Sequence, residues 1–253
     1  MNKQNKSRLL VAVLLIGALA ASGCAGHRKL VSPDADTTLV DDPPVNDPLE
    51  GFNRRMFDFN DFLDRKLLRP AAQGYRNVVP TPVRRGIGNF FRNLLEPTNV
   101  INNLLQGKPE QAVSDLWRFI MNSTIGVIGF RDVATAMGLE RHQEDFGQTF
   151  AVWGFGSGPY LVLPFLGPSN VRDGLGLIPY YVYTDPRLIV EDTITEVALI
   201  SVNVVDTRAQ LLSTSRVLEL QLDPYVFTRE AVRQRRLDLI HDGNPPLPDN
   251  EFQ

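Results

Sequence analysis

The chain has 253 residues, of which 43% are hydrophobic and 22% charged. This length and composition suffice for one or two packed domains and exclude disorder of the whole chain. A single Cys excludes an internal disulfide framework, and with only three His, none at ligand spacing, we expect no metal site and no cofactor. The net charge of −3 argues against nucleic acid as a partner.

The first 23 residues are typical of a secretory signal peptide. Three cations, Lys3, Lys6 and Arg8, precede an apolar run from Leu9 to Ala20, which is too short to span a bilayer. Once these three of the 26 basic residues leave, 23 remain against 29 acidic ones, and the net charge becomes −6. The sequence therefore predicts an exported, acidic mature chain.

The signal ends in Ala21-Ser22-Gly23-Cys24, which resembles the bacterial lipobox. In that motif a peptidase cuts before a Cys that has received a diacylglycerol. We therefore expect Cys24 to be lipidated and acyl chains such as palmitate to anchor the protein. Ala21 stands where the motif usually has Leu, so an ordinary signal peptide with an unmodified Cys is the alternative. Ala25, where an Asp would favour the inner membrane, indicates the outer membrane.

Beyond the signal, the composition predicts one domain between two loose segments. Residues 24–46 are rich in Asp, Pro and Thr and indicate an extended tether, whereas residues 241–253 indicate a flexible C-terminal tail. Residues 47–240 are predicted to be mostly α-helical, with at most a short strand at Tyr160–Leu163. We expect helices over 48–68, 82–95, 98–106, 109–124, 144–153, 170–178, 186–204, 206–220 and 224–240.

The first of these helices has the clearest start signal. In Asp47-Pro48-Leu49-Glu50, Asp47 is a candidate N-cap acceptor, Pro48 fits the first turn, and Glu50 is spaced to reach back to the cap. This spacing predicts a capping box. Asp185-Pro186 and Asp223-Pro224 repeat the combination of an Asp cap and a Pro.

The same helix is amphipathic, and its charged side is expected to form the i,i+4 pairs Arg54–Asp58 and Asp61–Arg65. Nine bases against five acids between Asp47 and Leu95 suit an anionic lipid surface. We therefore predict a lipid-facing helix, although a helix facing the protein core would show the same periodicity. The apolar arc comprises Leu49, Phe52, Met56, Phe59, Phe62 and Leu63.

Catalytic chemistry finds little support in the sequence. His142, Glu144 and Asp145 beside Arg141 resemble a general-base cluster, but no partner nucleophile is evident, and a solvated helix start explains them as well. Gly154–Pro159 lacks the spacing of a phosphate-binding loop or of a nucleophile elbow. We expect no catalytic residue and no enzyme.

The glycine-rich stretch suits a mobile element better. Its glycines loosen the backbone, and large rings flank them. We predict a gating hairpin, with a Gly-Pro turn between two buried segments as the alternative. Its residues are Trp153, Gly154, Phe155, Gly156, Gly158, Pro159 and Tyr160.

Several motifs in order resemble the MlaA/VacJ family of phospholipid-transport lipoproteins. The resemblance covers about residues 46–240. It rests on Asn46–Arg54, Glu96–Gly107, Arg118-Phe119, Asn122–Gly126, Gly129–Asp132, Asp145–Thr149, Gly158–Tyr160, Leu163-Pro164, Thr207–Leu212, Asp223–Tyr225 and Arg229-Glu230.

The resemblance implies a ring of amphipathic helices around a central channel, lying in the periplasmic-side leaflet of the outer membrane. Misplaced phospholipids would pass from the outer leaflet through this channel to a soluble periplasmic lipid carrier, and a trimeric porin would hold the ring. The family's flexible hairpin corresponds to Trp153–Leu166. Two other functions remain open: a lipoprotein that hydrolyses phospholipids, and a structural anchor associated with porins.

Overall fold

The computed structural model describes residues 47–185, 190 and 192–246. The chain divides into two units, Met1–Pro44 and Val45–Gln253, and the described residues all belong to the second. The predicted signal peptide, the lipidation site Cys24 and the tether 24–46 lie outside the described residues, as do the last seven residues of the predicted tail.

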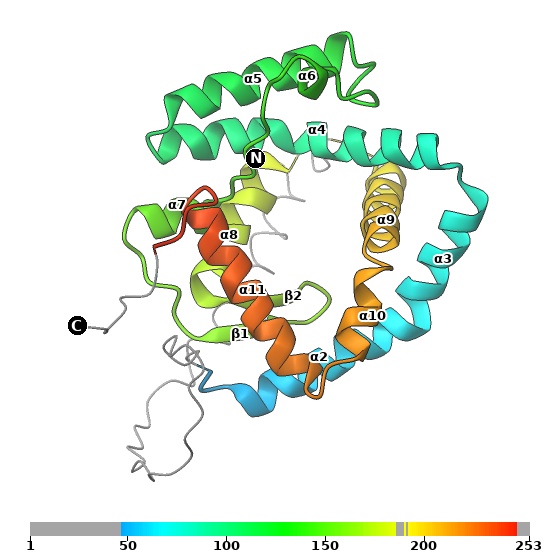
Figure 1. Cartoon of the computed structure of the whole chain (residues 1–253), viewed down its shortest axis with the longest axis vertical. Coiled ribbons are helices and arrows are strands. Elements are labelled where there is room, and N and C mark those ends of the chain that lie inside the picture. Colours follow the sequence, from blue (N-terminus) through cyan, green and yellow to red (C-terminus); the bar gives the residue numbers. More distant parts are fainter. Residues whose placement is uncertain (1–46, 186–189, 191, 247–253) are drawn as a thin grey trace. The chain divides into compact units, whose positions relative to one another are not determined.

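The described part of the chain is mostly helical, as predicted (Figure 1). Its first half contains one long helical run, a helical hairpin and two short helices. The run is α2 (Glu50–Leu63), the π-helical turn η1 (Asp64–Leu68) and α3 (Arg69–Val78); the hairpin is α4 (Thr81–Leu105) and α5 (Pro109–Thr124); the short helices are α6 (Val133–Ala136) and α7 (Phe146–Val152).

The second half opens with a two-stranded antiparallel sheet, in which Tyr160 lies opposite Asn170 and Leu163 opposite Gly167. Five helical elements follow it. The elements are β1 (Tyr160–Leu163), β2 (Gly167–Asn170), α8 (Val171–Pro179), the π-helical turn η2 (Tyr180–Thr184), α9 (Thr193–Gln210), α10 (Thr214–Glu219) and α11 (Pro224–Ile240).

The predicted helices 109–124 and 224–240 and the strand Tyr160–Leu163 are confirmed. The division between 82–95 and 98–106 is wrong, because Pro97 lies inside the continuous helix α4. Proline removes one helical hydrogen bond, but polar contacts to α5 and to Arg141 hold both sides of this position. The predicted boundary near residue 205 is also wrong, since α9 continues to Gln210. The elements α3, β2 and α6 were not predicted, and the first predicted helix ended too early, at residue 68.

The predicted capping box at Asp47 is wrong as well. Helix α2 begins at Glu50 after Leu49, without a side-chain cap. The Asp47 carboxylate instead accepts hydrogen bonds from Tyr225 Oη at 2.5 Å and Arg229 Nη1 at 3.2 Å, both on α11. Asp47, which has the spacing of an N-cap, therefore joins the start of the described chain to α11 near its end.

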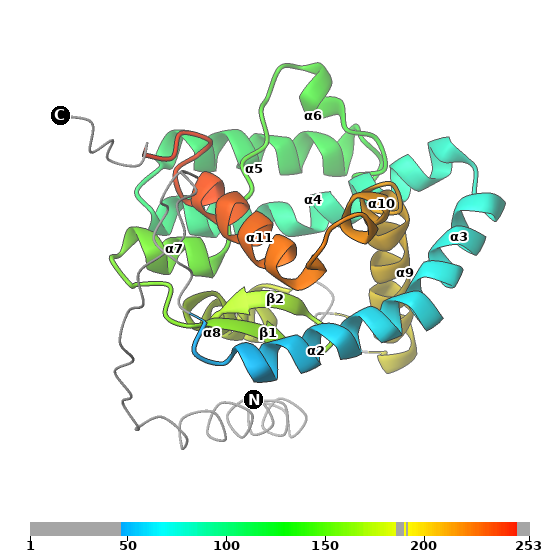
Figure 2. The ribbon, with the colours of Figure 1, turned by 60° about the horizontal axis from the view of Figure 1, so that its bottom comes forward.

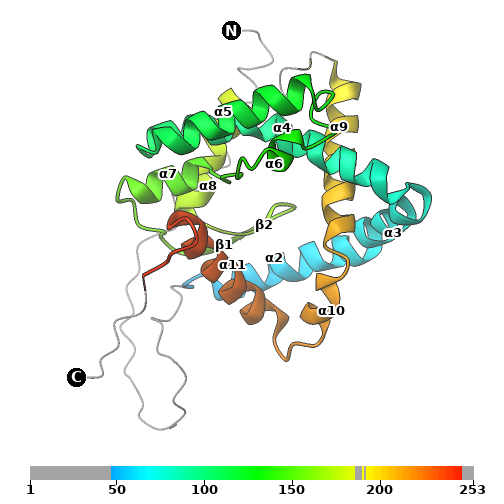
Figure 3. The same cartoon turned by 45° about the horizontal axis from the view of Figure 1, so that its top comes forward.

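Contacts between elements close into a continuous series (Figures 1 and 3). The run from α2 to α3 contacts α9, which contacts α4, and α4 contacts α7. Helix α7 contacts α8, α8 contacts β2, and β1 returns to α2. Helix α11 joins this series through contacts with α10, α7 and β2. Among the described residues, the helices are too short or too polar to cross a membrane.

Candidate functional site

The interior and exterior of the described body are reversed in polarity relative to a typical water-soluble domain. Eight of the nine largest fully buried side chains are polar or charged. Large apolar side chains instead lie exposed on α2, α4, α5 and α9. Charged side chains are almost never fully buried unless they are paired, and broad exposed apolar surface marks contact with other apolar matter.

Helix α5 shows the reversal most clearly. Its exposed stripe has helical spacing, and within it Trp117 is 50% exposed. The opposite stripe contains two charged residues, Asp115 and Arg118, that are at most 2% exposed. The exposed stripe is Val113, Leu116, Trp117 and Ile120, and the buried stripe is Ala112, Asp115, Arg118 and Asn122.

The predicted lipid-facing residues of α2 share one surface of that helix. Leu49, Phe52, Phe59 and Phe62 are exposed, whereas Met56 and Leu63 are half-buried. A helix packed against the protein core by this arc would bury these rings. Of the two predicted ion pairs, Asp61–Arg65 is present at 2.9 Å, but Arg54 pairs with Glu50 and Asp223 in place of Asp58.

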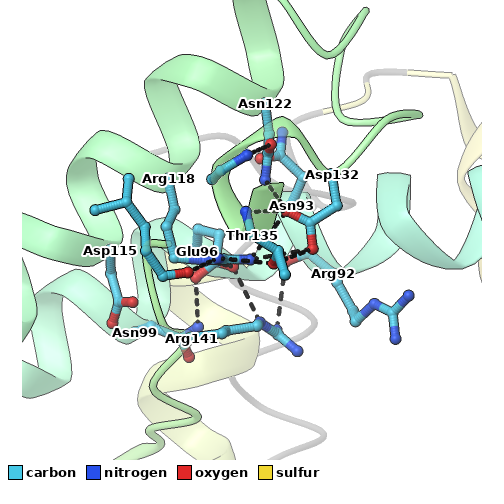
Figure 4. A network of polar contacts seen from close by, with 12 residues as sticks. Arg92, Asn93, Glu96, Asn99, Asp115, Arg118, Asn122, Asp132, Thr135 and Arg141 are labelled. Carbon is cyan, nitrogen blue, oxygen red and sulfur yellow. Dashed lines mark hydrogen bonds and ion pairs between the residues drawn. The ribbon is translucent and has the colours of Figure 1, made fainter. Parts of the chain in front are cut away.

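Buried charges join α4 to α5 and to the segment that follows them (Figure 4). Arg118 lies at the centre, where its guanidinium contacts Glu96 at 3.6 Å and Asp132 at 3.3 Å and donates to Thr135 and to the Leu139 carbonyl. We call this set, completed by Arg141, the α4–α5 seam. The Glu96 carboxylate also accepts from Arg141 Nε at 2.9 Å and from Asn99 at 2.8 Å.

Burial shifts the pKa of two acids at the α4–α5 seam. It raises the pKa of Glu96 above the ordinary value, although Arg141 and Asn99 favour the ionised form. It also raises the pKa of Asp115, against the opposing hydrogen bond of His142. These carboxyl groups are therefore costly to ionise, and each has a hydrogen-bond donor that reduces this cost.

The general-base cluster considered from the sequence is divided among separate partners. His142 Nδ1 contacts Asp115 at 3.1 Å, Glu144 binds Gln106 and Lys108, and Asp145 binds Arg236. These side chains connect different elements and do not converge on one reacting atom. Within the described residues, no group of three His, Cys, Asp or Glu side chains could hold a metal ion.

The β1–β2 hairpin lies beside α2 and is bound to it by two asparagines (Figure 2). Asn53, which is fully buried, donates to the Tyr160 carbonyl at 3.0 Å and accepts from the Val162 amide at 2.9 Å. Its amide thus pairs with β1 much as a neighbouring strand would. Asp47 accepts a further hydrogen bond from the same Asn53 nitrogen at 2.8 Å.

Asn60 repeats this arrangement seven residues later, at the tip of the hairpin. It donates to the Leu163 carbonyl at 2.9 Å and accepts from the Phe165 amide at 2.8 Å. Phe165 is 77% exposed, has a left-handed φ of 65°, and packs edge-on against Phe59 with ring centroids 5.5 Å apart. The tip is therefore strained and exposed.

The predicted gating residues lie mostly outside this hairpin. Only Tyr160 belongs to a strand, whereas Trp153–Pro159 form the connection from α7 to β1. Gly154 and Gly158 have φ of 91° and 65°, as expected for glycines in turns. Sequence reasoning missed Asn53 and Asn60. Their heptad spacing on an amphipathic helix is a signal that could have indicated them.

Three comparisons agree on the relationship of this chain to known proteins. The MlaA lipoprotein family matches residues 45–238. The intermembrane phospholipid transport system lipoproteins MlaA of Shigella flexneri and Escherichia coli K12 are each 37% identical over 245 residues, which covers 95% of this chain and 92% of theirs. The corresponding lipoprotein of Haemophilus influenzae is 34% identical over 236 residues, covering 92% of this chain and 91% of its own length.

A solved structure has the same fold. It comes from work on the structural basis for maintenance of bacterial outer membrane lipid asymmetry, is 39% identical, and superimposes with a TM-score of 0.68 over 77% of this chain and 98% of its own. The motifs, the polar interior and these matches together show that the chain belongs to the MlaA lipoprotein family.

Proposed function

We propose that this lipoprotein removes misplaced phospholipids from the outer leaflet of the outer membrane and delivers them to a soluble periplasmic lipid carrier. It does so from the periplasmic-side leaflet, anchored by acylated Cys24, and maintains lipid asymmetry without making or breaking a bond. The relatives named as phospholipid transport lipoproteins support this proposal.

The observation that carries the proposal is the reversed polarity of the described body. Exposed stripes such as that of α5 suit acyl chains, because burying apolar surface against hydrocarbon removes it from water. The closed series of contacts from α2 through α9, α4, α7 and α8 to β1 suits a ring. A passage with polar walls through such a ring would spare a charged headgroup the cost of crossing hydrocarbon unaided.

A trimeric porin is the partner that we expect to hold this ring at a fixed depth. The exposed apolar residues of α4, α5 and α9 offer surface to such a protein as well as to lipid. The hairpin and the Trp153–Pro159 connection are the elements that we expect to gate the passage.

The test is the lipid content and activity of the purified, acylated chain. We expect mass spectrometry to find intact phospholipid bound, and labelled lipid to move between vesicles when the chain and a carrier are present. Release of free fatty acid would favour a hydrolase. Absence of both bound lipid and transfer would favour a structural anchor.

In cells, we expect Cys24→Ser to leave phospholipid at the surface, because the unanchored chain loses its position at the membrane. An added probe that reacts only with surface aminophospholipid would measure this. Normal lipid asymmetry in the Cys24→Ser strain would contradict the role of the anchor.

A further inference from the structure

A charged cleft lies between the α2–η1 segment and the segment from α10 to α11. Ion pairs join the run from α2 to α3 with this second segment, Arg54–Asp223 at 2.9 Å and Arg69–Glu219 at 2.5 Å. The cleft has a volume of about 430 Å³, within the range of small-ligand sites. It shares no residue with the α4–α5 seam, and its lining residue Tyr225 packs edge-on against Tyr160 of β1.

Two arginines of this cleft have hydrogen-bonding capacity left over. Arg65 uses only its Nε, toward Asp61, and its side chain is more than half exposed. Arg69 binds Glu219 through Nη1, while its buried Nε has no hydrogen-bond partner and lies 3.9 Å from Asp64. Guanidinium groups with free nitrogens are the preferred protein partners of phosphate, because their planar fork matches two oxygens.

The cleft is not a simple anion site, however. Four arginines and five carboxylates line it, which gives a net charge of −1. Among the acids, Asp58 is exposed and forms no ion pair within the described chain. A ligand that carries only negative charge would meet these carboxylates, whereas a ligand with both a phosphate and an ammonium group would satisfy both kinds of wall.

Apolar side chains lie in the segment from α10 to α11 that lines the cleft. Leu218 lines it, and Leu220 and Leu222, in the same short segment, are almost completely exposed. Hydrocarbon lying over these leucines would remove their surface from water. The cleft thus combines charged walls of both signs with an apolar edge, which is the pattern complementary to an amphiphile.

From this combination we infer that the cleft binds the phosphate–ammonium headgroup of a zwitterionic phospholipid. The phosphate lies at Arg65 and Arg69, and the ammonium lies at Asp58 and Asp61. The acyl chains pass over Leu218, Leu220 and Leu222. The inference rests on the proposed function and extends it by naming the headgroup class. It gives the protein a preference for zwitterionic over purely anionic phospholipids.

The experiment titrates the full, acylated chain in detergent with short-chain phosphatidylethanolamine and with phosphatidylglycerol of the same chain length. Arg65→Gln is the main variant, because its one ion pair is exposed and its loss should spare the fold. Arg76→Gln, an exposed arginine on α3, is the matched control. Water-soluble glycerophosphoethanolamine and inorganic phosphate separate lipid binding from binding of the free headgroup or of phosphate alone.

We expect Arg65→Gln to weaken phosphatidylethanolamine binding roughly tenfold, the effect of one charge-assisted hydrogen bond, and Arg76→Gln to leave it unchanged. Asp58→Asn should reduce the preference for phosphatidylethanolamine over phosphatidylglycerol. Equal binding of phosphatidylethanolamine by the wild type and by Arg65→Gln overturns the inference. So does equal binding of both lipids by the wild type, or tighter binding of inorganic phosphate than of lipid.

Vesicle-to-vesicle transfer, measured on the same proteins, separates this site from the transport function. If Arg65→Gln loses binding while the wild type moves no lipid, the headgroup site stands and the proposed function fails. If the wild type moves lipid and Arg65→Gln binds phosphatidylethanolamine normally, the transport function stands and the headgroup site is rejected.

Discussion

The α4–α5 seam and the β1–β2 hairpin are both built on buried or half-buried polar contacts, but they differ in how firmly those contacts hold. In the seam, paired charges such as Arg118 and Glu96 are almost fully buried and cannot separate without leaving a charge in an apolar place. In the hairpin, neutral amides bind backbone groups, and the tip is exposed. The seam is therefore the rigid frame, and the hairpin tip is the part that can move.

The largest expected effect follows from breaking the seam. Replacing Arg118 with Met leaves Glu96 and Asp132 without their shared partner, and we expect a loss of about 3–5 kcal/mol in the free energy of unfolding. The control is Arg131→Met, an exposed position next to Asp132. This variant should change the free energy of unfolding by no more than about 0.5 kcal/mol. Denaturation of the mature chain in detergent measures both. A loss below about 1 kcal/mol for Arg118→Met would contradict the frame.

The seam should also respond to pH in the opposite direction from a more exposed ion pair. Burial raises the pKa of Glu96, so its contribution to stability is complete below its ordinary pKa and is lost as pH rises through the raised value. The hydrogen bond from Arg54 lowers the pKa of Asp223, whose contribution is lost as pH falls through the lowered value.

We therefore expect the stability of the wild type relative to Glu96→Gln to decrease as pH rises from about 4, near the ordinary pKa of Glu. The stability relative to Asp223→Asn should decrease as pH falls from about 4, and only slightly, because that pair is partly exposed. Denaturation curves between mildly acidic and neutral pH test both signs. If both stability differences change with pH in the same direction, burial does not raise the pKa of Glu96.

A smaller difference in stability is expected between substitutions at the β1 end of the hairpin and at its tip. Asn53→Ala leaves the buried amide and carbonyl of β1 without partners and should cost about 2 kcal/mol, whereas Asn60→Ala, at a half-exposed site, should cost about 1 kcal/mol or less. We expect the Phe165 amide to exchange hydrogen at least tenfold faster in Asn60→Ala, while the Val162 amide stays protected.

The control for this comparison is Asn77→Ala, an exposed position on α3. It should change neither the stability nor the exchange at the tip. Slow exchange of the Phe165 amide in Asn60→Ala would mean that the tip is held by contacts other than this asparagine.

Periodicity predicted the helices but not the direction in which their faces point. The predicted limits of α5, Pro109–Thr124, are confirmed, but the period did not show which side faces outward. Val113 and Trp117 are exposed, whereas Asp115 and Arg118 face inward. A 3.6-residue period is the same for a helix on a water-soluble core and for one surrounded by lipid. Only the packing partner decides, and for α5 that partner is the polar face of α4.

Contacts between residues far apart along the chain could not be predicted from the sequence either. Asp47 has the spacing of a helix cap but binds Tyr225 and Arg229, which are more than 170 residues away along the chain. The roles of Asn53 and Asn60 were not predicted, because their partners are backbone groups of β1 and of the hairpin tip, which no side-chain pattern reveals. The strand Tyr160–Leu163 was predicted correctly, whereas its partner strand β2 was not predicted.

The surroundings of Trp117 test the central claim, that the outward stripes contact hydrocarbon, most directly. The chain has two tryptophans, so Trp153→Phe leaves Trp117 as the sole emitter, half exposed on the outer stripe of α5. In bilayers that contain brominated phospholipid, we expect strong quenching of its fluorescence, a blue-shifted emission and little quenching by aqueous acrylamide. Strong quenching by acrylamide and none by the brominated lipid would place the stripe in water and contradict the account.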